Sequence, residues 1–276
     1  MAIPLPIIAF LILHWVLAVF FQTFFQHRYG AHRMFTTTPR WERFFHLCTY
    51  LSQGSSYLNP RAYAILHRMH HAYSDTELDP HSPIIQKSPL LMMERTRKIY
   101  RGILYGRHPV EQRFLGNYPE WPLLDRFAHR WFIAVGWGAA HVLVYAVFAT
   151  QWWHFLLLPV HWFMGPVHGA IVNWFGHWFG YRNFDRKDAS RNTLPIDFVT
   201  MGELFQNNHH TYGSRPNFAV RWYEIDPSFS VIKLLDALGV IRLRGSMAEK
   251  NPVEVSEDTP LAPLAPPAVV APQLDR

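Results

Sequence analysis

The chain alternates between long apolar stretches and segments that hold all of its charged side chains. Residues 1–27 and 131–181 contain no Asp, Glu, Lys or Arg. The first stretch includes the run PLPIIAFLILHWVLAVFFQTFF from Pro4 to Phe25, and one membrane crossing takes about 20 residues. Residues 131–173 are long enough for two crossings, with a tight turn at Gln151. The pattern therefore predicts three membrane-spanning helices.

The distribution of positive charge predicts the orientation of these helices. Every Lys and Arg lies in residues 28–130 or 182–276, and basic loops stay in the cytoplasm. The amino terminus should then lie outside the cytoplasm and the carboxyl terminus inside. A cleaved signal peptide is the alternative for the first stretch, but that stretch lacks a basic n-region and an A-x-A-like site. We expect a retained helix in the inner membrane.

Histidines gather in four groups at the edges of, or within, the basic segments. They occur as HxxxxH (His27, His32), as HxxHH (His67 to His71), as NWFGH (His177) and as NNHH (His209, His210). On an α-helix the offsets i, i+3 and i+4 bring side chains to one face. Because all four groups lie in the basic segments or at their edges, they should share one side of the membrane, which the charge pattern identifies as cytoplasmic.

The segment Trp41–Pro60, WERFFHLCTYLSQGSSYLNP, lies between two of these groups and is moderately apolar. A single crossing here would put the first two histidine groups on opposite sides. An interfacial or re-entrant helix fits its Ser, Gln and Gly content better. Short cytoplasmic helices should follow between His71 and Trp131, with turns at DPHSP and NYPEWP.

The expected fold is thus all-α: about three spans, one interfacial or re-entrant helix, and a cytoplasmic helical cap that holds the histidines. Residues 1–250 should form one domain. From Asn251 onward the run PLAPLAPPAVVAP predicts a disordered tail over residues 251–276.

Composition narrows the chemistry of the histidine groups. Cys48 is the single cysteine, so a multi-ligand metal site must use nitrogen and oxygen donors. The net charge of +6 could suit nucleic acid, but its confinement between apolar spans argues for a membrane protein. Eight histidines exceed what one ion needs, which indicates two metals. Because lipid chains are the nearest substrate, we expect the metal to be iron, which can activate O2 for reaction with such chains.

These motifs together resemble the membrane fatty-acyl desaturases of the stearoyl-CoA desaturase type. SDTELDPHSP after the second box and GYRNFD after His177 add to the resemblance, which runs from His27 to Asn217. In that family the boxes bind two irons, which use O2 and two electrons to remove a vicinal pair of hydrogens from an acyl chain. The resemblance implies a desaturase that introduces a cis double bond into a saturated chain, of the delta-9 type.

Carried over box by box, the resemblance assigns the metal ligands. They would be His27, His32, His67, His70, His71, His177, His209 and His210, with Asn173 holding a metal-bound water. The third box departs from the animal pattern, because Gln206 stands where the first histidine of HxxHH would be. This QNNHH form marks a bacterial type of the family, and Gln206 is an additional candidate ligand. The chain also has room for one span before the first box, where animal relatives have two.

Other polar residues receive supporting roles. His14, His141, His154 and His161 lie within expected spans and should be packed and hydrogen-bonded rather than ligating. His81 is a candidate support for a ligand, and His168 falls on another helix face from Asn173. We expect the carboxylates next to the boxes to accept ring N–H groups of ligating histidines; these are Asp75, Asp79, Asp185 and Glu203.

Three alternatives stand beside desaturation. A hydroxylase or acetylenase could use the same di-iron scaffold, a non-catalytic membrane protein could carry metal, and a heme protein could use paired histidines. Heme would leave most of the eight histidines idle. The expected partners are a fatty-acyl substrate (acyl-CoA, acyl carrier protein or lipid ester) and an external electron donor, such as a ferredoxin or cytochrome with its reductase; nucleic acid is not expected.

Overall fold

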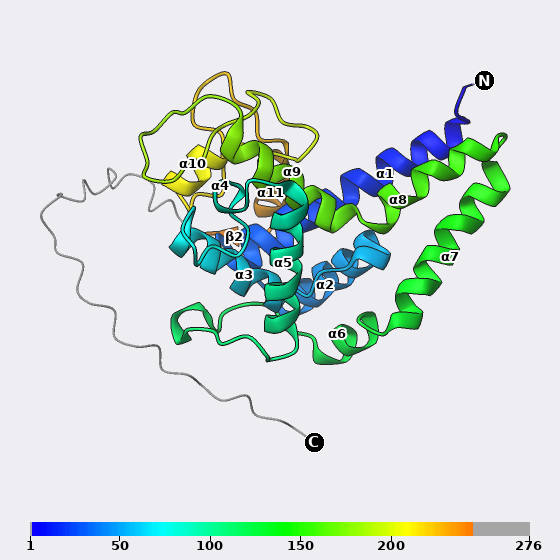
Figure 1. The fold of residues 1–276 in the computed structure, drawn as a ribbon, viewed down its shortest axis with the longest axis horizontal. Coiled ribbons are helices and arrows are strands. Elements are labelled where there is room, and N and C mark those ends of the chain that lie inside the picture. Colours follow the sequence, from blue (N-terminus) through cyan, green and yellow to red (C-terminus); the bar gives the residue numbers. More distant parts are fainter. Residues whose placement is uncertain (1, 245–276) are drawn as a thin grey trace, which may run out of the picture.

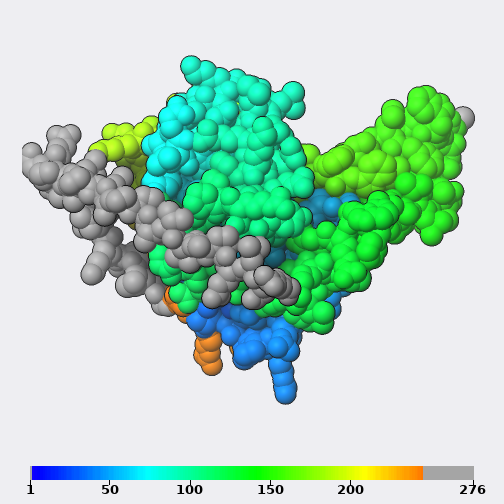
Figure 2. Space-filling model, turned by 60° about the horizontal axis from the view of Figure 1, so that its bottom comes forward, coloured from blue at the N-terminus to red at the C-terminus, as the bar shows by residue number. Residues whose placement is uncertain are grey.

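The computed structural model describes residues 2–244, so the predicted tail lies outside the described residues. Two helices in this part of the chain are long and apolar enough to cross a membrane. The first is the continuous run Leu5–Ala31, which consists of α1 (Leu5–Phe21) and a π-helix, η1 (Gln22–Ala31); the second is α7 (Trp131–Phe148). Figure 1 shows α1, α7 and α8 together as an arm beside the cap, and in Figure 2 the α7 region (green) projects from the body.

The third expected span is bent rather than straight. It comprises the 3-10 helix η4 (Trp152–Leu157), α8 (Leu158–Trp162) and α9 (Met164–Trp178), with a 70° bend between α8 and α9. Pro166 explains the break, because in a continuous helix its ring would clash with the carbonyl of Trp162. The span predicted over residues 152–173 is therefore a bent pair of helices that can form one broken span, and α9 continues to Trp178.

The π-helix accounts for the five-residue spacing of the first histidine box. A π-helix is defined by i→i+5 hydrogen bonds, and the amide of His32 donates to the carbonyl of His27 at 3.1 Å. An α-helix would put residues five apart on different faces. The local backbone thus places His27 and His32 side by side.

The segment Trp41–Pro60 is not among the described helices that are long and apolar enough to cross a membrane. It folds as α2 (Pro39–Gln53) and the 3-10 helix η2 (Gly54–Ser56). The Thr38 hydroxyl caps α2 by accepting from the amide of Trp41, and Gly54 ends it at a φ of 54°. One face packs against α1, while Trp41, Phe44, Leu47 and Leu51 point outward. This exposed apolar stripe fits the predicted interfacial helix.

The cap is built from short helices around two hydrophobic clusters, one of them aromatic. Its elements are α3 (Pro60–Tyr73), α4 (Pro83–Gln86), α5 (Pro89–Leu104), η3 (Gln112–Phe114), α6 (Pro122–Ala128), α10 (Gln206–Thr211), α11 (Pro227–Ala237) and an antiparallel pair, β1 (Phe35–Thr37) with β2 (Ile241–Leu243). Phe24, Phe35, Phe205 and Phe218 belong to the aromatic cluster. With only this strand pair among the described residues, the predicted all-α membrane fold is confirmed.

Arg68 fixes the first two histidine boxes relative to each other. From α3 its guanidinium donates to the carbonyls of Gly30 and Ala31 at the end of η1, at 3.0 and 2.9 Å. It also donates to the backbone carbonyls of Phe114 and Gly116 at 3.0 and 2.7 Å. Because a planar guanidinium holds its donors in a rigid fork, these bonds set the position of η1 against α3.

The histidines of the arm are packed as expected, but not every ring nitrogen is hydrogen-bonded. His14 Nδ1 lies 2.7 Å from His161 Nδ1, and His161 Nε2 lies 3.0 Å from the Tyr145 hydroxyl. The His141 ring lies 5.0 Å from that of His14. His154 is the clearest exception, because neither of its buried ring nitrogens has a hydrogen-bond partner, and His141 Nδ1 is also buried without one.

Candidate metal centre

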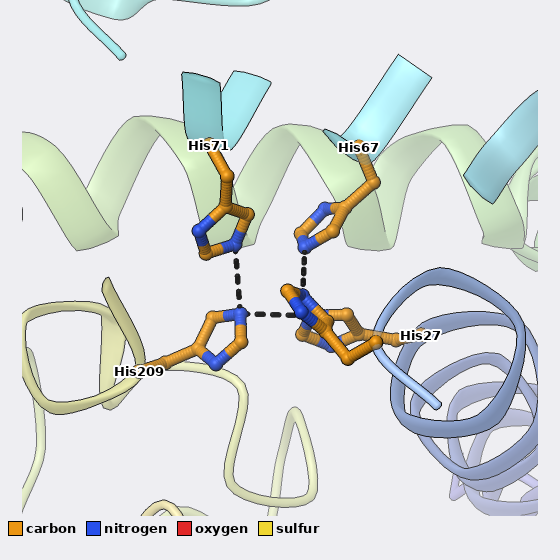
Figure 3. Close-up of side chains that lie close together, drawn as sticks. His27, His67, His71 and His209 are labelled. Carbon is orange, nitrogen blue, oxygen red and sulfur yellow. Dashed lines mark hydrogen bonds between the residues drawn. The ribbon is translucent and has the colours of Figure 1, made fainter. Parts of the chain in front are cut away.

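Five of the eight predicted histidines converge on one point. The five-histidine cluster consists of His27, His32, His67, His71 and His209, whose ligand atoms all lie within 4.8 Å of one another. Figure 3 shows rings from η1, α3 and α10 pointing toward one another. His209 is 182 residues away from His27 in the chain, yet their Nε2 atoms are 3.0 Å apart.

The remaining three histidines form a second group. The three-histidine cluster consists of His70, His177 and His210, again with ligand atoms within 4.8 Å. They come from α3, α9 and α10. Helix α3 thus serves both clusters: His67 and His71 face one, and His70 faces the other. The structure brings together all eight predicted histidines, in a five-to-three division that the sequence did not indicate.

The short distances between ring nitrogens are better explained by cations bound between the rings than by hydrogen bonds. His209 Nε2 lies 3.0 Å from His27 Nε2 and 2.9 Å from His71 Nε2. One ring nitrogen is either a donor or an acceptor, so it cannot serve both neighbours well. Metal–nitrogen bonds of about 2.0–2.1 Å place two ligands at a right angle about 2.9 Å apart. The nitrogens therefore have the spacing of ligands around an ion.

Unpartnered nitrogens in the three-histidine cluster support the same conclusion. His177 Nδ1 contacts Asp75 at 3.1 Å, while His177 Nε2 is buried without a hydrogen-bond partner. A buried polar atom left unpaired is costly unless something binds it. The residues present therefore fit metal ions in both clusters.

Four carboxylates, three of them buried and Asp75 half-buried, lie against the outer nitrogens of ligand candidates. Glu203 lies 2.7 Å from His27 Nδ1 and Asp79 lies 3.0 Å from His70 Nδ1. Asp75 contacts His177, as expected, and Asp188 lies 3.5 Å from His210 Nδ1. Such contacts fix the tautomer and leave the other nitrogen free for a metal.

The prediction that Asp185 supports a ligating histidine was wrong. Asp185 is fully exposed and pairs at 3.9 Å with Arg182, so it reaches no histidine. Asp188 takes the role instead, held by the amide of Ser190 at 3.1 Å and by Arg186 at 2.9 Å. Both acids lie in the same irregular loop, where no helical period indicates which side chain turns inward.

Burial and charge set the protonation of the site. Desolvation, with help from neighbouring histidines, holds the pKa values of His32, His67, His71 and His209 well below the usual range. Burial likewise lowers the pKa of His210 to about 4. These rings are therefore neutral at pH 7, the form that binds metals.

The carboxylates next to these neutral rings are ionised and carry fixed negative charges. Burial opposes their ionisation, but contacts with His177 lower the pKa of Asp75 to about 2, and those with His27 and Arg28 lower that of Glu203 to about 2. Around His70, burial is outweighed by Asp79, which raises the pKa of that imidazole.

Asn173 and Gln206 each lie four residues before a histidine of the three-histidine cluster and on the same helix as it. Asn173 shares α9 with His177, and its amide donates to the carbonyl of Gly169 at 2.8 Å. The Gln206 amide donates to the carbonyl of Glu203 at 2.7 Å. Gly176 makes room for Gln206, because a Cβ at residue 176 would lie 2.5 Å from Gln206 Cγ.

An apolar cavity of about 530 Å³ opens beside these residues. Leu58, Leu66, Met92 and Val172 contribute to its apolar wall, and Asn173, Gln206 and His67 line it from the metal side. Its outer edge includes the exposed Leu90, Arg97 and Arg101 of α5. A long apolar molecule can therefore reach His67 of the five-histidine cluster together with Asn173 and Gln206, while His70, His177 and His210 do not line the cavity.

Two further buried histidines line this cavity. His81 and His168 are each buried, and neither ring nitrogen of either has a hydrogen-bond partner. The His81 ring lies 4.3 Å from that of His70, which fits the expected support of a ligand. Helical angle alone predicts that His168 faces away from Asn173. Its place on a cavity wall depends on tertiary packing, which helical angle cannot indicate.

Comparison with known proteins agrees with this geometry. The family model described as fatty acid desaturase matches residues 4–233. An sn-1 stearoyl-lipid 9-desaturase of Anabaena variabilis is 30% identical, over 83% of this chain and 80% of that protein. A hex-5-enoyl-(acyl-carrier protein) acetylenase of Moorena producens (strain JHB) is 28% identical, over 85% of this chain and 75% of that protein. An acyl-CoA 5-desaturase of Anemone leveillei is 31% identical, over 83% and 68%. The chain therefore belongs to the fatty acid desaturase family, and it is a membrane oxidoreductase that acts on fatty acyl chains.

Proposed function

We propose that the protein is a di-iron, O2-dependent desaturase that introduces a cis double bond at the delta-9 position of a saturated acyl chain. The observation that carries the proposal is the pair of buried histidine clusters beside an apolar cavity, which His67 of the larger cluster lines together with Asn173 and Gln206. The relatives named as 9-desaturases support the position of the double bond. Bound iron would supply the activation of O2 and the transfer of electrons.

The overall reaction determines what the protein residues must do. One O2, two electrons and two protons convert a CH2–CH2 unit into CH=CH and release two water molecules. The cavity wall holds the chain and excludes bulk water, and the four carboxylates keep the imidazoles oriented. All eight histidines would bind iron, five in one cluster and three in the other.

Asn173 and Gln206 would complete the three-histidine site. Because the Gln206 amide nitrogen is engaged with Glu203, its carbonyl oxygen remains as the acceptor that can face an ion or a water. The Asn173 amide is likewise engaged with Gly169, which leaves its carbonyl oxygen to hold a water beside the ion. Both residues line the cavity, so the same groups would meet the acyl chain.

The partners follow from the relatives and from charge. The relatives are named for lipid esters, acyl-CoA and acyl carrier protein, and this chain would use one of these carriers. A separate ferredoxin or cytochrome with its reductase would deliver electrons. The distribution of basic residues supports a centre on the cytoplasmic face of the inner membrane, and an anionic donor or head group would suit that face.

Lipid analysis of a host that expresses the chain tests this proposal. We expect new monounsaturated acyl chains in the wild type and none with His210→Ala, while His154→Ala serves as a matched histidine control outside both clusters. Purified protein should hold close to two irons per chain. An acetylenic product would favour the acetylenase alternative, which one relative's name supports; hydroxylated chains would favour a hydroxylase.

A further inference from the structure

An exposed apolar surface lies on two loop segments of the cap, outside both histidine clusters. We call it the apolar rim; it consists of Leu194, Ile196, Phe198, Val199, Trp222 and Ile225. Phe198 is 64% exposed and Trp222 is 94% exposed. Apolar side chains gathered in this way mark a surface that another apolar phase or molecule covers.

Backbone pairing joins the two segments into one surface. Ile196 and Ile225 form a parallel bridge, and the amide of Ile225 donates to the carbonyl of Pro195 at 3.1 Å. Residues about 30 positions apart therefore present their side chains together.

A buried carboxylate builds the projecting loop. Asp197 points inward and accepts from the amides of Thr200, Gly202 and Leu204 at 2.8, 3.1 and 3.0 Å. Since Asp197 and Thr200 are buried, Phe198 and Val199 between them point outward. The exposure of these two side chains is thus part of a fixed loop structure.

The rim lies where the membrane-facing part of α1 ends. The Trp15 indole donates to the carbonyl of Val199 at 2.8 Å. Leu17, two residues later, is the last exposed side chain of the first helix, and residues 18–31 are all buried or half-buried within the protein. Val199 is therefore level with the border between lipid and cap, the depth at which Trp side chains are enriched.

We propose that the apolar rim is immersed in the head-group region of the bilayer and anchors the cap to the membrane. Between residues 192 and 202 the single charged residue is Asp197, which is turned inward. Arg191 and Arg221 flank the two segments and can pair with anionic head groups. A soluble partner protein, by contrast, would have to enter the lipid interface to reach Val199.

Fluorescence quenching by lipids tests this proposal without reference to activity. Cys48→Ser removes the native thiol, and Phe198→Cys or Trp222→Cys then carries a polarity-sensitive probe. Asp185→Cys is the matched control on a fully exposed cap residue. The full chain is placed in phosphatidylcholine–phosphatidylglycerol vesicles with and without a lipid that bears a nitroxide near its head group.

We expect both rim probes to emit at shorter wavelength than the Asp185→Cys probe and to lose most of their emission with the nitroxide lipid. Two rim positions are used so that one poorly folded variant does not decide the result. Water-like, unquenched emission from the rim probes would overturn the proposal. A blue shift without quenching that grows with protein density would assign the rim to a second copy of the chain, and would overturn it as well.

Discussion

The two histidine clusters share α3 and α10 but differ in how fully nitrogen donors surround them. The five-histidine cluster takes one ring from α10 and four from η1, α3 and the residue that ends η1. The three-histidine cluster has one ring from each of three helices, and Asn173 and Gln206 next to it line the cavity. We infer that the five-histidine ion is the more firmly held, and that the three-histidine ion has open positions for chemistry.

The largest effect should come from removing a ring from the smaller cluster. His210→Ala leaves two imidazoles there, and we expect loss of one ion per chain and a fall in desaturation of more than about 100-fold. His209→Ala leaves four imidazoles in the other cluster and should release less metal. Iron content and acyl-chain analysis measure both. Equal metal loss in the two variants would remove the distinction between the clusters.

Loss of a supporting carboxylate should have an intermediate effect. Asp188→Asn weakens the hold on His210, and we expect about 10–100-fold lower affinity for the second ion. Asp185→Asn is the matched control in the same loop and should change nothing, because Asp185 is solvent-exposed. Competition with a metal chelator gives both values. If the two variants lose metal alike, Asp188 acts through the loop rather than through His210.

Smaller effects should follow from disturbing Gln206. Gly176→Ala forces a Cβ against Gln206 Cγ, and we expect about a tenfold loss of affinity at the three-histidine site, similar to Gln206→Ala. Gly169→Ala is the control on the same helix, because its Cβ would meet no atom within 4 Å. Gln206→His should be tolerated and should tighten binding. Full retention of both irons in Gln206→Ala would remove Gln206 from the site.

The most subtle contrast is in the pH dependence of the metal-free protein. His209 has a depressed pKa in the fold, so below about 6.5 the unfolded chain binds the extra proton and folding stability falls as the pH drops. His70 has a raised pKa, so its contribution is present at low pH and is lost as the pH rises through the folded pKa. Between pH 5 and 6.5, His209→Gln should flatten the slope of unfolding free energy against pH by up to about 1.4 kcal/mol per pH unit, whereas His70→Gln should change the slope only above about pH 6.5, where it removes a fall in stability. Chemical denaturation at several pH values measures these slopes, and identical slopes would contradict the assignment.

The parts of the molecule that could be predicted from sequence are those with a local signal. Charge-free runs located α1 and α7, and histidine spacing located all eight clustered rings. Spacing on α3 also shows that three histidines share a face, but the division between His70 and its neighbours depends on how η1 and α9 pack against α3. Chain position alone could not supply that arrangement.

Irregular backbone accounts for most of the remainder. The choice of Asp188 over Asp185 depends on a loop without periodicity, and the bend before α9 depends on how a proline is accommodated. The cavity walls at His81 and His168 come from helices that are distant in sequence. The structure describes none of residues 245–276, so the tail remains a prediction, as does the domain boundary at residue 250.

The π-helical turn has a consequence for how the first box can vary. One extra residue in an α-helix is absorbed as such a turn, so HxxxxH here is the inserted form of an i, i+4 pair. Deleting a single residue between His27 and His32 would let the segment relax to an ordinary α-helix in which the two rings still share a face. The deletion would also rotate the rest of α1 by about 100° relative to the cap, which would turn Trp15 away from Val199. The length of this motif therefore determines the rotation of α1 about its axis as well as the positions of the two candidate ligands.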